Sequence, residues 1–314
     1  MTKPSILQMG PYPEWDQTVL DADYTVHRYD LAADKPAFLA QVGPKIRAIA
    51  TRGDLGAPTA VIAACPQVEI IAINGVGYDS VDMPTARARG IKVTNTPDVL
   101  TDDVADLAVG MLLMQARGML GAEHWARSGD WVTKGGFALQ RKVTGLRVGI
   151  LGLGRIGLAI GRRLAGFDMD IAYSATAPKP GVAWEFIADP VTLAARSDVL
   201  IMALAASPAT RHIVNADVLA ALGPQGMLIN VSRAANVDEE ALLAALENGT
   251  LGSAALDVFE GEPRLNPRFT ALPNVLLQPH HASGTVETRR AMGQLMRDNL
   301  TAHFAGQPLL TPVP

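Results

Sequence analysis

Short apolar runs recur through the first third of the chain, and polar or helix-like stretches separate them. Five runs have the length and composition of buried strands, at residues 5–9, 24–29, 46–51, 68–74 and 92–95. Strands at this spacing are typical of repeated βα units, in which each connection returns the chain to the same edge of the sheet. The first third therefore predicts a parallel sheet with helices on its faces.

A second series of apolar runs follows a long helical stretch. The N-cap cluster Thr101-Asp102-Asp103 opens that stretch, whose apolar positions continue to Met114. The second series has runs at residues 147–151, 170–173, 199–204, 227–232, 253–258 and 275–278, and a last helical stretch covers 286–304. We expect a second doubly wound sheet, with the last helix returning to the first domain. The predicted domains are residues 1–99 with 286–314, and residues 100–285.

Length and composition agree with this organisation. A chain of 314 residues exceeds what one hydrophobic core usually supports. Hydrophobic residues make up 48% of the chain and aromatic residues only 5%, which suits close-packed helices on parallel sheets better than a β-sandwich. The predicted fold class is therefore α/β, with two doubly wound parallel-sheet domains.

Charge and cysteine content limit the partners and the compartment. The formal net charge of -4 provides no broad cationic field for a polyphosphate, so we do not expect a nucleic acid as partner. Cys65 has no second cysteine to pair with, which is typical of a reducing compartment. No apolar stretch is long enough to span a bilayer, and the first residues lack the apolar core of a signal peptide. We therefore expect a cytoplasmic protein without a membrane partner.

A glycine-rich turn, Gly152-Leu153-Gly154-Arg155-Ile156-Gly157, separates the strand-like run 147–151 from the helical stretch 156–167. Glycines at this spacing permit a tight turn, a close approach of the backbone to a pyrophosphate, and close packing of helix on strand. The helix N-terminus also favours negative charge. In this context the motif predicts a bound dinucleotide, whereas alone it also fits a turn without a ligand. The residues expected at the cofactor are Gly152, Leu153, Gly154, Arg155 and Ile156.

The end of the next strand indicates which dinucleotide is bound. NAD-selective sites usually have Asp or Glu there, which binds the ribose hydroxyls and repels a 2′-phosphate. This chain has Ser174 at that position. Ser174 and Thr176 would donate hydrogen bonds to a 2′-phosphate, with Lys179 or Arg155 as a nearby cation, although Lys179 also fits a simple polar loop. We predict NADP as the cofactor, with NAD as a second acceptable dinucleotide.

Six segments, in order, resemble the D-2-hydroxyacid dehydrogenase family over essentially the whole chain, and in particular its glyoxylate/hydroxypyruvate reductases and plant-type hydroxyphenylpyruvate reductases. They are residues 75–79, 95–106, 152–157, 230–233, 256–263 and 279–285. The resemblance implies a Rossmann dinucleotide-binding domain and a flavodoxin-like substrate domain. It also implies a homodimer in contact through the helix from Thr101 and its neighbours.

The resemblance further implies three catalytic residues, Arg233, Glu262 and His280. Reduction of a 2-keto acid needs a hydride at the carbonyl carbon and a proton at its oxygen. Imidazoles change charge near neutral pH, so His280 would be the acid in reduction and the base in oxidation. Glu262 would hydrogen-bond and orient the imidazole, and Arg233 would hold the substrate carboxylate with its forked guanidinium. Singly, each residue also fits a structural role, but the ordered set favours catalysis.

The same resemblance assigns further positions. The turn Gly75-Val76-Gly77 would offer backbone N–H groups to the substrate carboxylate, with Arg52 beside it. Asp257 would contact the nicotinamide carboxamide, with a structural role as the alternative. Trp131 would shape the substrate pocket across a dimer interface, or simply pack within that interface.

Three positions depart from the family pattern. The family commonly has glycine where this chain has Ala234 and Ala282, and NADP-selective relatives often have arginine where it has Thr176. Each alanine methyl group would narrow the site, and Thr176 weakens the case for strict NADP selectivity. His281 has no assigned role, because neighbouring side chains tend to point apart and His280 is the expected acid.

The predicted function is the reduction of glyoxylate, hydroxypyruvate or a related 2-keto acid to the D-2-hydroxy acid, by hydride transfer from NADPH or NADH. The alternative is a dinucleotide-sensing binding protein or corepressor on the same scaffold, because fold alone does not separate the two. A metal-dependent enzyme using His280 and His281 is disfavoured, since adjacent histidines lack the spacing of a two-histidine metal site. We therefore expect no metal.

Overall fold

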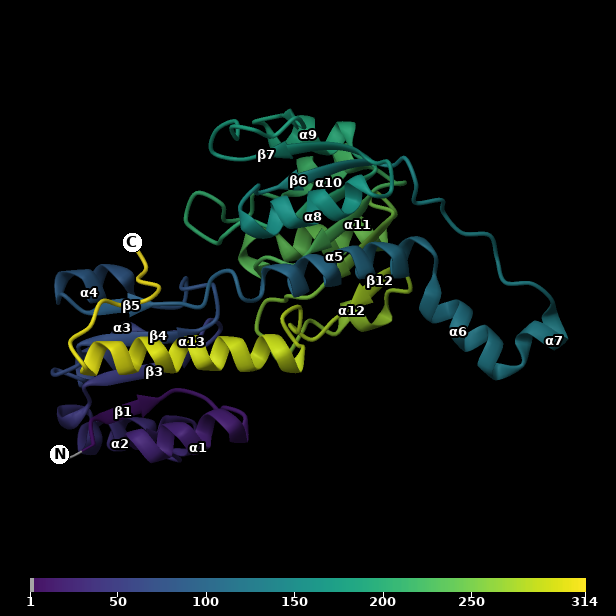
Figure 1. Cartoon of the computed structure of the whole chain (residues 1–314). Coiled ribbons are helices and arrows are strands. Elements are labelled where there is room, and N and C mark those ends of the chain that lie inside the picture. Colours follow the sequence, from purple (N-terminus) through teal and green to yellow (C-terminus); the bar gives the residue numbers. More distant parts are fainter. Residues whose placement is uncertain (1–2) are drawn as a thin grey trace. The chain divides into compact units, whose positions relative to one another are not determined.

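The computed structural model describes residues 3–314, and the chain divides into two compact units (Figure 1). Unit 1 comprises Met1–Leu100 and Gly284–Pro314, and unit 2 comprises Thr101–Ser283. The sequence predicts the first boundary after residue 99 and the second before residue 286, whereas unit 1 ends at residue 100 and resumes at residue 284.

Unit 1 is built on a parallel sheet. Its strands are β1 (Ser5–Gln8), β2 (Thr25–Arg28), β3 (Ala48–Arg52), β4 (Ile70–Asn74) and β5 (Lys92–Thr94). They pair in the order β2-β1-β3-β4-β5. This is the strand order of flavodoxin-like folds, which confirms the fold expected for the substrate domain.

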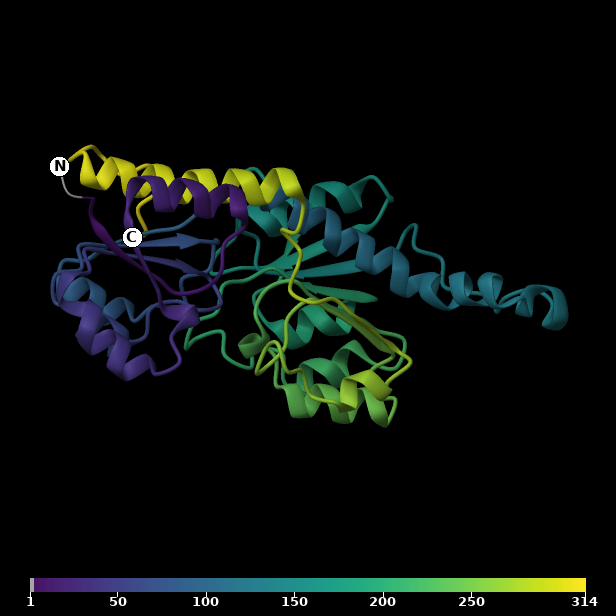
Figure 2. The same ribbon diagram turned by 90° about the horizontal axis from the view of Figure 1, so that it is seen from below.

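Helices cover both faces of this sheet. They are α1 (Glu14–Asp23), α2 (Lys35–Val42), α3 (Thr59–Ala64), α4 (Met83–Ala88) and α13 (Val286–Phe304), with 3-10 turns η1 (Tyr29–Leu31) and η2 (Gly43–Lys45). Ile6 of β1 packs in a cluster with α1 and α13, whereas the next residue, Leu7, packs with α2, α3 and α4. α13 lies alongside α1 (Figure 2). Both ends of α13 match the prediction, and the Thr285 side chain caps its first turn by accepting from the Thr288 N–H.

Unit 2 is built on a larger parallel sheet. Its strands are β6 (Arg147–Leu151), β7 (Asp170–Ser174), β8 (Glu185–Phe186), β9 (Val199–Met202), β10 (Met227–Asn230), β11 (Ser253–Leu256) and β12 (Val275–Leu277). They pair in the order β12-β11-β10-β9-β6-β7-β8. This is the Rossmann order with one strand added, as expected. The pattern of apolar runs did not predict β8, because it has only two residues.

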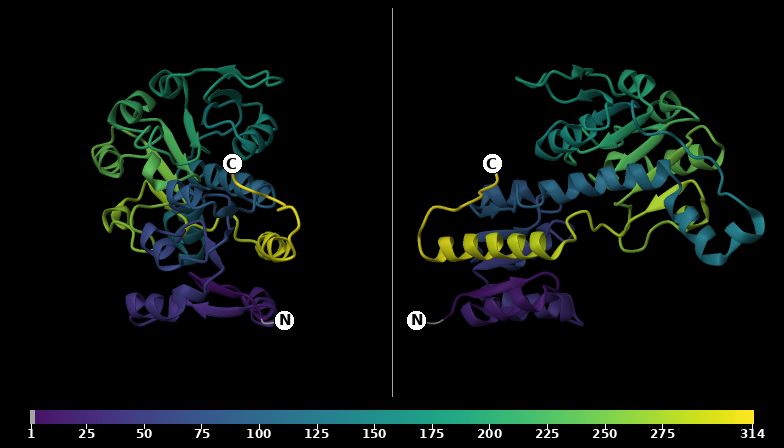
Figure 3. Two further views of the ribbon diagram at one scale, coloured as in Figure 1. Left: turned by 90° about the vertical axis from the view of Figure 1, so that its left-hand side faces the viewer. Right: turned by 45° about the vertical axis from the view of Figure 1, so that its right-hand side comes forward.

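Helices also cover both faces of the sheet of unit 2. The helices are α5 (Thr101–Ala116), α6 (Met119–Ser128), α7 (Asp130–Lys134), α8 (Arg155–Ala165), α9 (Pro190–Arg196), α10 (Ala216–Leu222), α11 (Glu239–Glu247) and α12 (Arg268–Ala271), with the 3-10 turn η3 (Ala234–Asn236). α5 packs on α8, where Ile150 of the sheet lies against Gly161. The next residue, Leu151, joins the cluster formed with α9, α10 and α11. α6 and α7 extend away from the sheet of unit 2 (Figure 3).

The apolar helices of residues 3–314 were compared with the length and hydropathy that a membrane span needs. Among residues 3–314, no single helix is long and apolar enough to cross a bilayer. Taken together, α5 and α6 are long and apolar enough, but they are bent relative to each other. α5 buries Met111 and Leu112 within unit 2. It is therefore a core helix of this unit.

Several predicted strands extend beyond the observed strands at their carboxyl ends. The runs 227–232 and 253–258 end as strands at Asn230 and Leu256. Ser232 and Asp257, in the turns that follow, are still only 6% and 1% exposed. Apolar patterning reports burial, so it does not separate a strand from the buried turn behind it. These buried turns carry the candidate site.

Candidate active site

The predicted cofactor and catalytic residues of unit 2 follow different strands of one sheet. The glycine turn follows β6, Ser174 ends β7, Arg233 follows β10, Glu262 follows β11, and His280 follows β12. Because all these strands are parallel, their carboxyl ends lie at the same edge. The fold therefore brings to one edge residues that are separated by more than a hundred positions in the sequence.

The three glycines of the turn have three different surroundings. Gly152 has φ 93°, and a Cβ there would lie 2.7 Å from the Cα of Leu204. A Cβ on Gly157 would collide with the carbonyl oxygen of Gly152. A Cβ on Gly154 would meet nothing within 4 Å. Gly152 thus permits the turn, Gly157 permits close packing of helix on strand, and Gly154 leaves the backbone open to a ligand.

The helix that follows the turn is oriented to bind an anion. α8 begins at Arg155, and its N-cap residue, Gly154, makes no side-chain hydrogen bond to the first turn. The N–H groups at the start of a helix favour negative charge, and those of a glycine cap are not covered by a side chain. The open surface at Gly154 and this helix start fit a dinucleotide pyrophosphate.

Ser174 differs from its predicted role. Its side chain is 8% exposed, and its hydroxyl donates to the carbonyl of Ala188 at 3.1 Å. Because a hydroxyl has one hydrogen to donate, Ser174 does not offer it to a 2′-phosphate in this structure. Thr176 and Lys179 lie on the exposed loop that follows. The predicted contacts to a 2′-phosphate therefore depend on these two residues rather than on Ser174.

His280 and Glu262 form a close pair. The Nδ1 atom of His280 lies 2.6 Å from Oε2 of Glu262. The other oxygen of Glu262 accepts the backbone N–H of Phe259 at 2.8 Å, so the carboxylate is held on both sides. Because this contact uses Nδ1, Nε2 is the ring atom through which His280 would transfer a proton. This arrangement is the geometry of a general acid oriented by a carboxylate.

A buried carboxylate holds the turn after His280. Asp257 is 1% exposed and accepts the backbone N–H groups of His281 and Ala282 at 2.9 and 3.0 Å. Burial raises the pKa of the Asp257 carboxyl above its ordinary value. His280 itself has φ 51°, a backbone conformation that non-glycine residues adopt rarely and mostly at constrained sites. The hydrogen bonds that Asp257 accepts from His281 and Ala282 favour a structural role for Asp257 over a contact with the nicotinamide.

Hydrogen bonds also fix the turn that carries Arg233. Asn230 accepts the N–H and the hydroxyl of Ser232 (2.9 and 2.8 Å) and donates to the Arg233 carbonyl (3.2 Å). Arg233 Nη1 donates to the Ser232 carbonyl at 2.9 Å. Asn236 is fully buried and donates to the carbonyl of Leu204 at 3.3 Å. No role was predicted from the sequence for Asn230 or Asn236, although Asn230, a polar residue at the end of a buried strand, signals a need for hydrogen-bond partners.

The departures from the family pattern are accommodated locally. Ala234 and Ala282 are not among the described residues with positive φ, so neither backbone position requires glycine.

The Nε2 atom of His281 lies 2.6 Å from the side-chain oxygen of Gln278. This contact gives His281 a partner away from Glu262. Among residues 3–314, no three His, Cys, Asp or Glu side chains gather as a metal site would require.

In unit 1, the turn Gly75-Val76-Gly77 is held from the segment after β5. Thr96 Oγ1 accepts the Gly75 N–H at 3.0 Å, and Asn95 Nδ2 donates to the Val76 carbonyl at 2.8 Å. The turn is predicted to offer backbone N–H groups to a carboxylate, and because the Gly75 N–H is bonded to Thr96, the groups it can offer in this structure are those of Val76 and Gly77. Within residues 3–314, no hydrogen bond occupies the N–H of Val76 or Gly77.

Arg52 is already paired in unit 1. Its Nε and Nη2 atoms lie 3.0 and 2.5 Å from the two carboxylate oxygens of Asp54. The neighbouring Gly53 lies beside Gly75, since a Cβ on Gly75 would lie 3.2 Å from the Gly53 nitrogen. Arg52 is thus near the predicted turn, but a substrate would have to share its guanidinium with Asp54.

Similarity to known proteins extends over nearly the whole chain. Residues 109–282 match the family model of the D-isomer specific 2-hydroxyacid dehydrogenase, NAD binding domain. The chain is 45% identical over 308 residues to hydroxyphenylpyruvate reductase of Plectranthus scutellarioides, with 98% of each chain covered.

Two solved structures extend this similarity to three dimensions. A 2-hydroxyacid dehydrogenase from Ketogulonicigenium vulgare Y25 is 67% identical with a TM-score of 0.93, covering 100% of this chain and 99% of that chain. An NADPH-dependent glyoxylate/hydroxypyruvate reductase from Sinorhizobium meliloti, solved with NADP and malonate, is 44% identical with a TM-score of 0.92, covering 99% and 97%. With the glycine turn, the histidine-glutamate pair and both strand orders, these likenesses show that the chain belongs to the D-2-hydroxyacid dehydrogenase family.

Proposed function

We propose that this protein reduces a small 2-keto acid, such as glyoxylate or hydroxypyruvate, to the D-2-hydroxy acid with NADPH as the preferred reductant. The observation that carries the proposal is the pair of His280 and Glu262, 2.6 Å apart, on the sheet edge that also carries the glycine turn. A dinucleotide site alone names no reaction. A carboxylate-oriented imidazole beside it supplies the proton that carbonyl reduction needs.

Each residue of the pair and Arg233 has a distinct part. NADPH, when bound, supplies the hydride for the carbonyl carbon. His280 donates a proton from Nε2 to the carbonyl oxygen, while Glu262 fixes the orientation of the ring through Nδ1. Arg233, whose turn Asn230 holds, binds the substrate carboxylate through its planar donors. Unit 1, considered by itself, offers the backbone N–H groups of Val76 and Gly77 to an anion such as a carboxylate.

The names of the relatives support this substrate class. One acts on hydroxyphenylpyruvate by its name, and the Sinorhizobium reductase acts on glyoxylate and hydroxypyruvate by its title. All three compounds carry a carboxylate next to a carbonyl. The groups assigned to Arg233 and His280 suit that shared part, while the rest of the substrate distinguishes the members of the class.

Steady-state kinetics with NADPH and NADH would test the proposal. We expect oxidation of NADPH with at least one of glyoxylate, hydroxypyruvate, hydroxyphenylpyruvate and 2-ketogluconate, and a lower kcat/KM with NADH. Pyridine nucleotide binding should be measured in parallel by calorimetry. Binding without turnover of any keto acid would reject the enzyme and favour the alternative, a dinucleotide-sensing protein.

We further propose a homodimer formed through an arm, defined as α6, α7 and residues 135–142. Neither helix of the arm has a buried residue. Leu120, Trp131, Val132 and Leu139 are 60%, 67%, 91% and 100% exposed. Apolar side chains gathered on a projecting segment are typical of an interface that another chain covers. A second copy of this chain is the occupant that the family resemblance implies, with Trp131 at the contact.

Charge placed on the arm should separate the dimer. We expect Leu120→Glu combined with Val132→Glu to shift the protein from dimer to monomer in sedimentation velocity, because two carboxylates cannot be desolvated in an apolar contact without a large cost. Leu31→Glu is the matched control, since Leu31 is also 71% exposed but lies in unit 1. A monomeric unsubstituted protein, or a double variant that remains a dimer, would reject this interface.

We also propose a cytoplasmic location. Cys65 is buried and unpaired, so nothing in the fold depends on an oxidising compartment. Fractionation of cells that express the protein would test this, and recovery outside the cytoplasm would reject it.

A further inference from the structure

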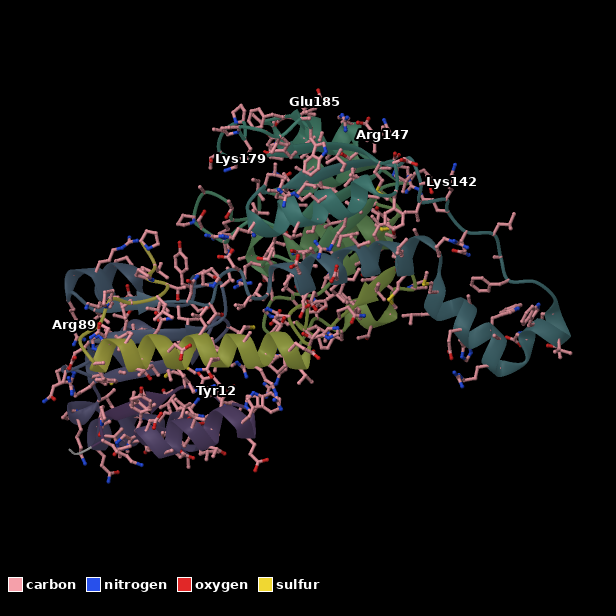
Figure 4. All side chains as sticks on the ribbon, viewed as in Figure 1. Tyr12, Arg89, Lys142, Arg147, Lys179 and Glu185 are labelled. Carbon is pink, nitrogen blue, oxygen red and sulfur yellow. The ribbon has the colours of Figure 1, made fainter. Side chains whose placement is uncertain are left out.

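A buried tyrosine closes the loop that carries the predicted 2′-phosphate contacts. Lys179 donates its backbone N–H to the hydroxyl of Tyr173 at 2.7 Å. Tyr173 belongs to β7 and is 1% exposed, whereas Thr176 and Lys179 are exposed. Figure 4 labels Lys179 on this loop and Glu185 at the start of β8, where the loop ends. The hydrogen bond joins an exposed loop to the core of unit 2.

The ring of Tyr173 is itself fixed. It packs against Phe186 with ring centroids 5.6 Å apart, and the two residues are partners in the β7–β8 pairing. On the opposite face of the sheet, Ser174 donates to the carbonyl of Ala188. The start of the loop is therefore anchored on both faces. A phenylalanine at position 173 would fill the same space as the tyrosine ring. Tyr173→Phe would therefore remove only the hydroxyl and its hydrogen bond to the loop.

We propose that Tyr173 is a positioning residue for the 2′-phosphate of NADP. Its hydroxyl holds residues 175–179 in the conformation that binds the phosphate. Thr176 and Lys179 supply a hydroxyl donor and a positive charge, the two kinds of group that bind phosphate oxygens. A loop ordered before binding loses less conformational entropy when the ligand arrives. This inference rests on the proposed function, in which NADP is the preferred cofactor.

The expected effect is selective for one dinucleotide. NAD has no 2′-phosphate, so it gains little from an ordered loop at residues 175–179. Tyr173 therefore favours binding of NADP over NAD by ordering residues 175–179. It does so although its side chain carries no charge that could attract the phosphate. A tyrosine that only stabilised the fold would affect both dinucleotides alike.

Binding titrations of Tyr173→Phe would test this. We expect the Kd for NADP+ and for 2′,5′-ADP to rise about fivefold to tenfold, which is the loss of one hydrogen bond's net contribution. The Kd for NAD+ and for 5′-AMP should change by less than about twofold. Tyr24→Phe is the matched control, because Tyr24 is another buried tyrosine but lies in unit 1. It should change none of the four values.

A second substitution separates the loop from the rest of the site. Lys179→Ala keeps the backbone N–H but removes the cation, so it should itself weaken NADP+ binding. Adding Tyr173→Phe to Lys179→Ala should then weaken NADP+ binding less than Tyr173→Phe does alone, since less remains to be positioned. Full additivity of the two effects would overturn the proposal.

The remaining outcomes distinguish this inference from the proposed function. If the unsubstituted protein binds 2′,5′-ADP no better than 5′-AMP, the proposed preference for NADP is wrong, and the proposed role of Tyr173 is wrong as well. If the protein prefers 2′,5′-ADP and Tyr173→Phe leaves that preference unchanged, only the role of Tyr173 is overturned. Equal weakening of all four ligands, with a lower Tm, would mean a purely structural role.

Discussion

His280→Ala should lower kcat for keto-acid reduction by about 10²- to 10⁴-fold, the range that a general acid contributes. The substitution removes the proton donor that Glu262 holds at 2.6 Å. The glycine turn after β6 stays intact, so the Kd for NADP+ should change little. Stopped-flow kinetics and calorimetry on the same preparation would measure both quantities.

His281→Ala is the matched control for this result. His281 is the adjacent imidazole, and its ring contacts Gln278 rather than Glu262. We expect its kcat to stay within about tenfold of the unsubstituted protein, since the acid and its partner remain. Equal losses in both variants, or loss of NADP+ binding in His280→Ala, would contradict the assignment of His280 as the acid.

Two glycines of the cofactor turn should respond differently to the same added methyl group. In Gly157→Ala the Cβ collides with the carbonyl oxygen of Gly152, so helix and strand must separate. We expect the free energy of unfolding to fall by about 1–3 kcal/mol, as for other overpacked sites, despite the better helix propensity of alanine. NADP+ binding should weaken as well, because the turn moves. Denaturant unfolding and calorimetry would measure the two effects.

Gly154→Ala is expected to separate binding from stability. Its methyl group meets nothing within 4 Å in the protein, so the cost to folding is at most about 1 kcal/mol for a poorer N-cap. The same open space is where a pyrophosphate would approach, so the Kd for NADP+ should rise on the order of tenfold, or ~1.4 kcal/mol. Unchanged affinity in Gly154→Ala would show that the cofactor does not bind against this glycine.

Local patterns in the sequence determined most of the fold. Continuous apolar runs marked β1 and β6, because strands buried on both faces have no polar side. The predicted helical stretch 286–304 matches both ends of α13, and the Thr285 cap of its first turn is seen in the structure. β8 was missed because two residues form no periodic pattern. The carboxyl ends of β10 and β11 were placed too late because the turns behind them are buried as well.

The candidate residues were recognisable from ordered motifs, but the partners of their side chains were not. The motifs named Gly75, Ser174 and Arg52, whereas the structure commits the N–H of Gly75 to Thr96, the hydroxyl of Ser174 to Ala188, and the guanidinium of Arg52 to Asp54. Hydrogen bonds act over about 3 Å in space, and most of these partners are more than ten residues apart in the chain. Residue types and their spacing thus determined the α/β fold and the kind of chemistry. Only the tertiary structure decided which donors and acceptors are already used, because that depends on which turns meet at the edge of a folded sheet.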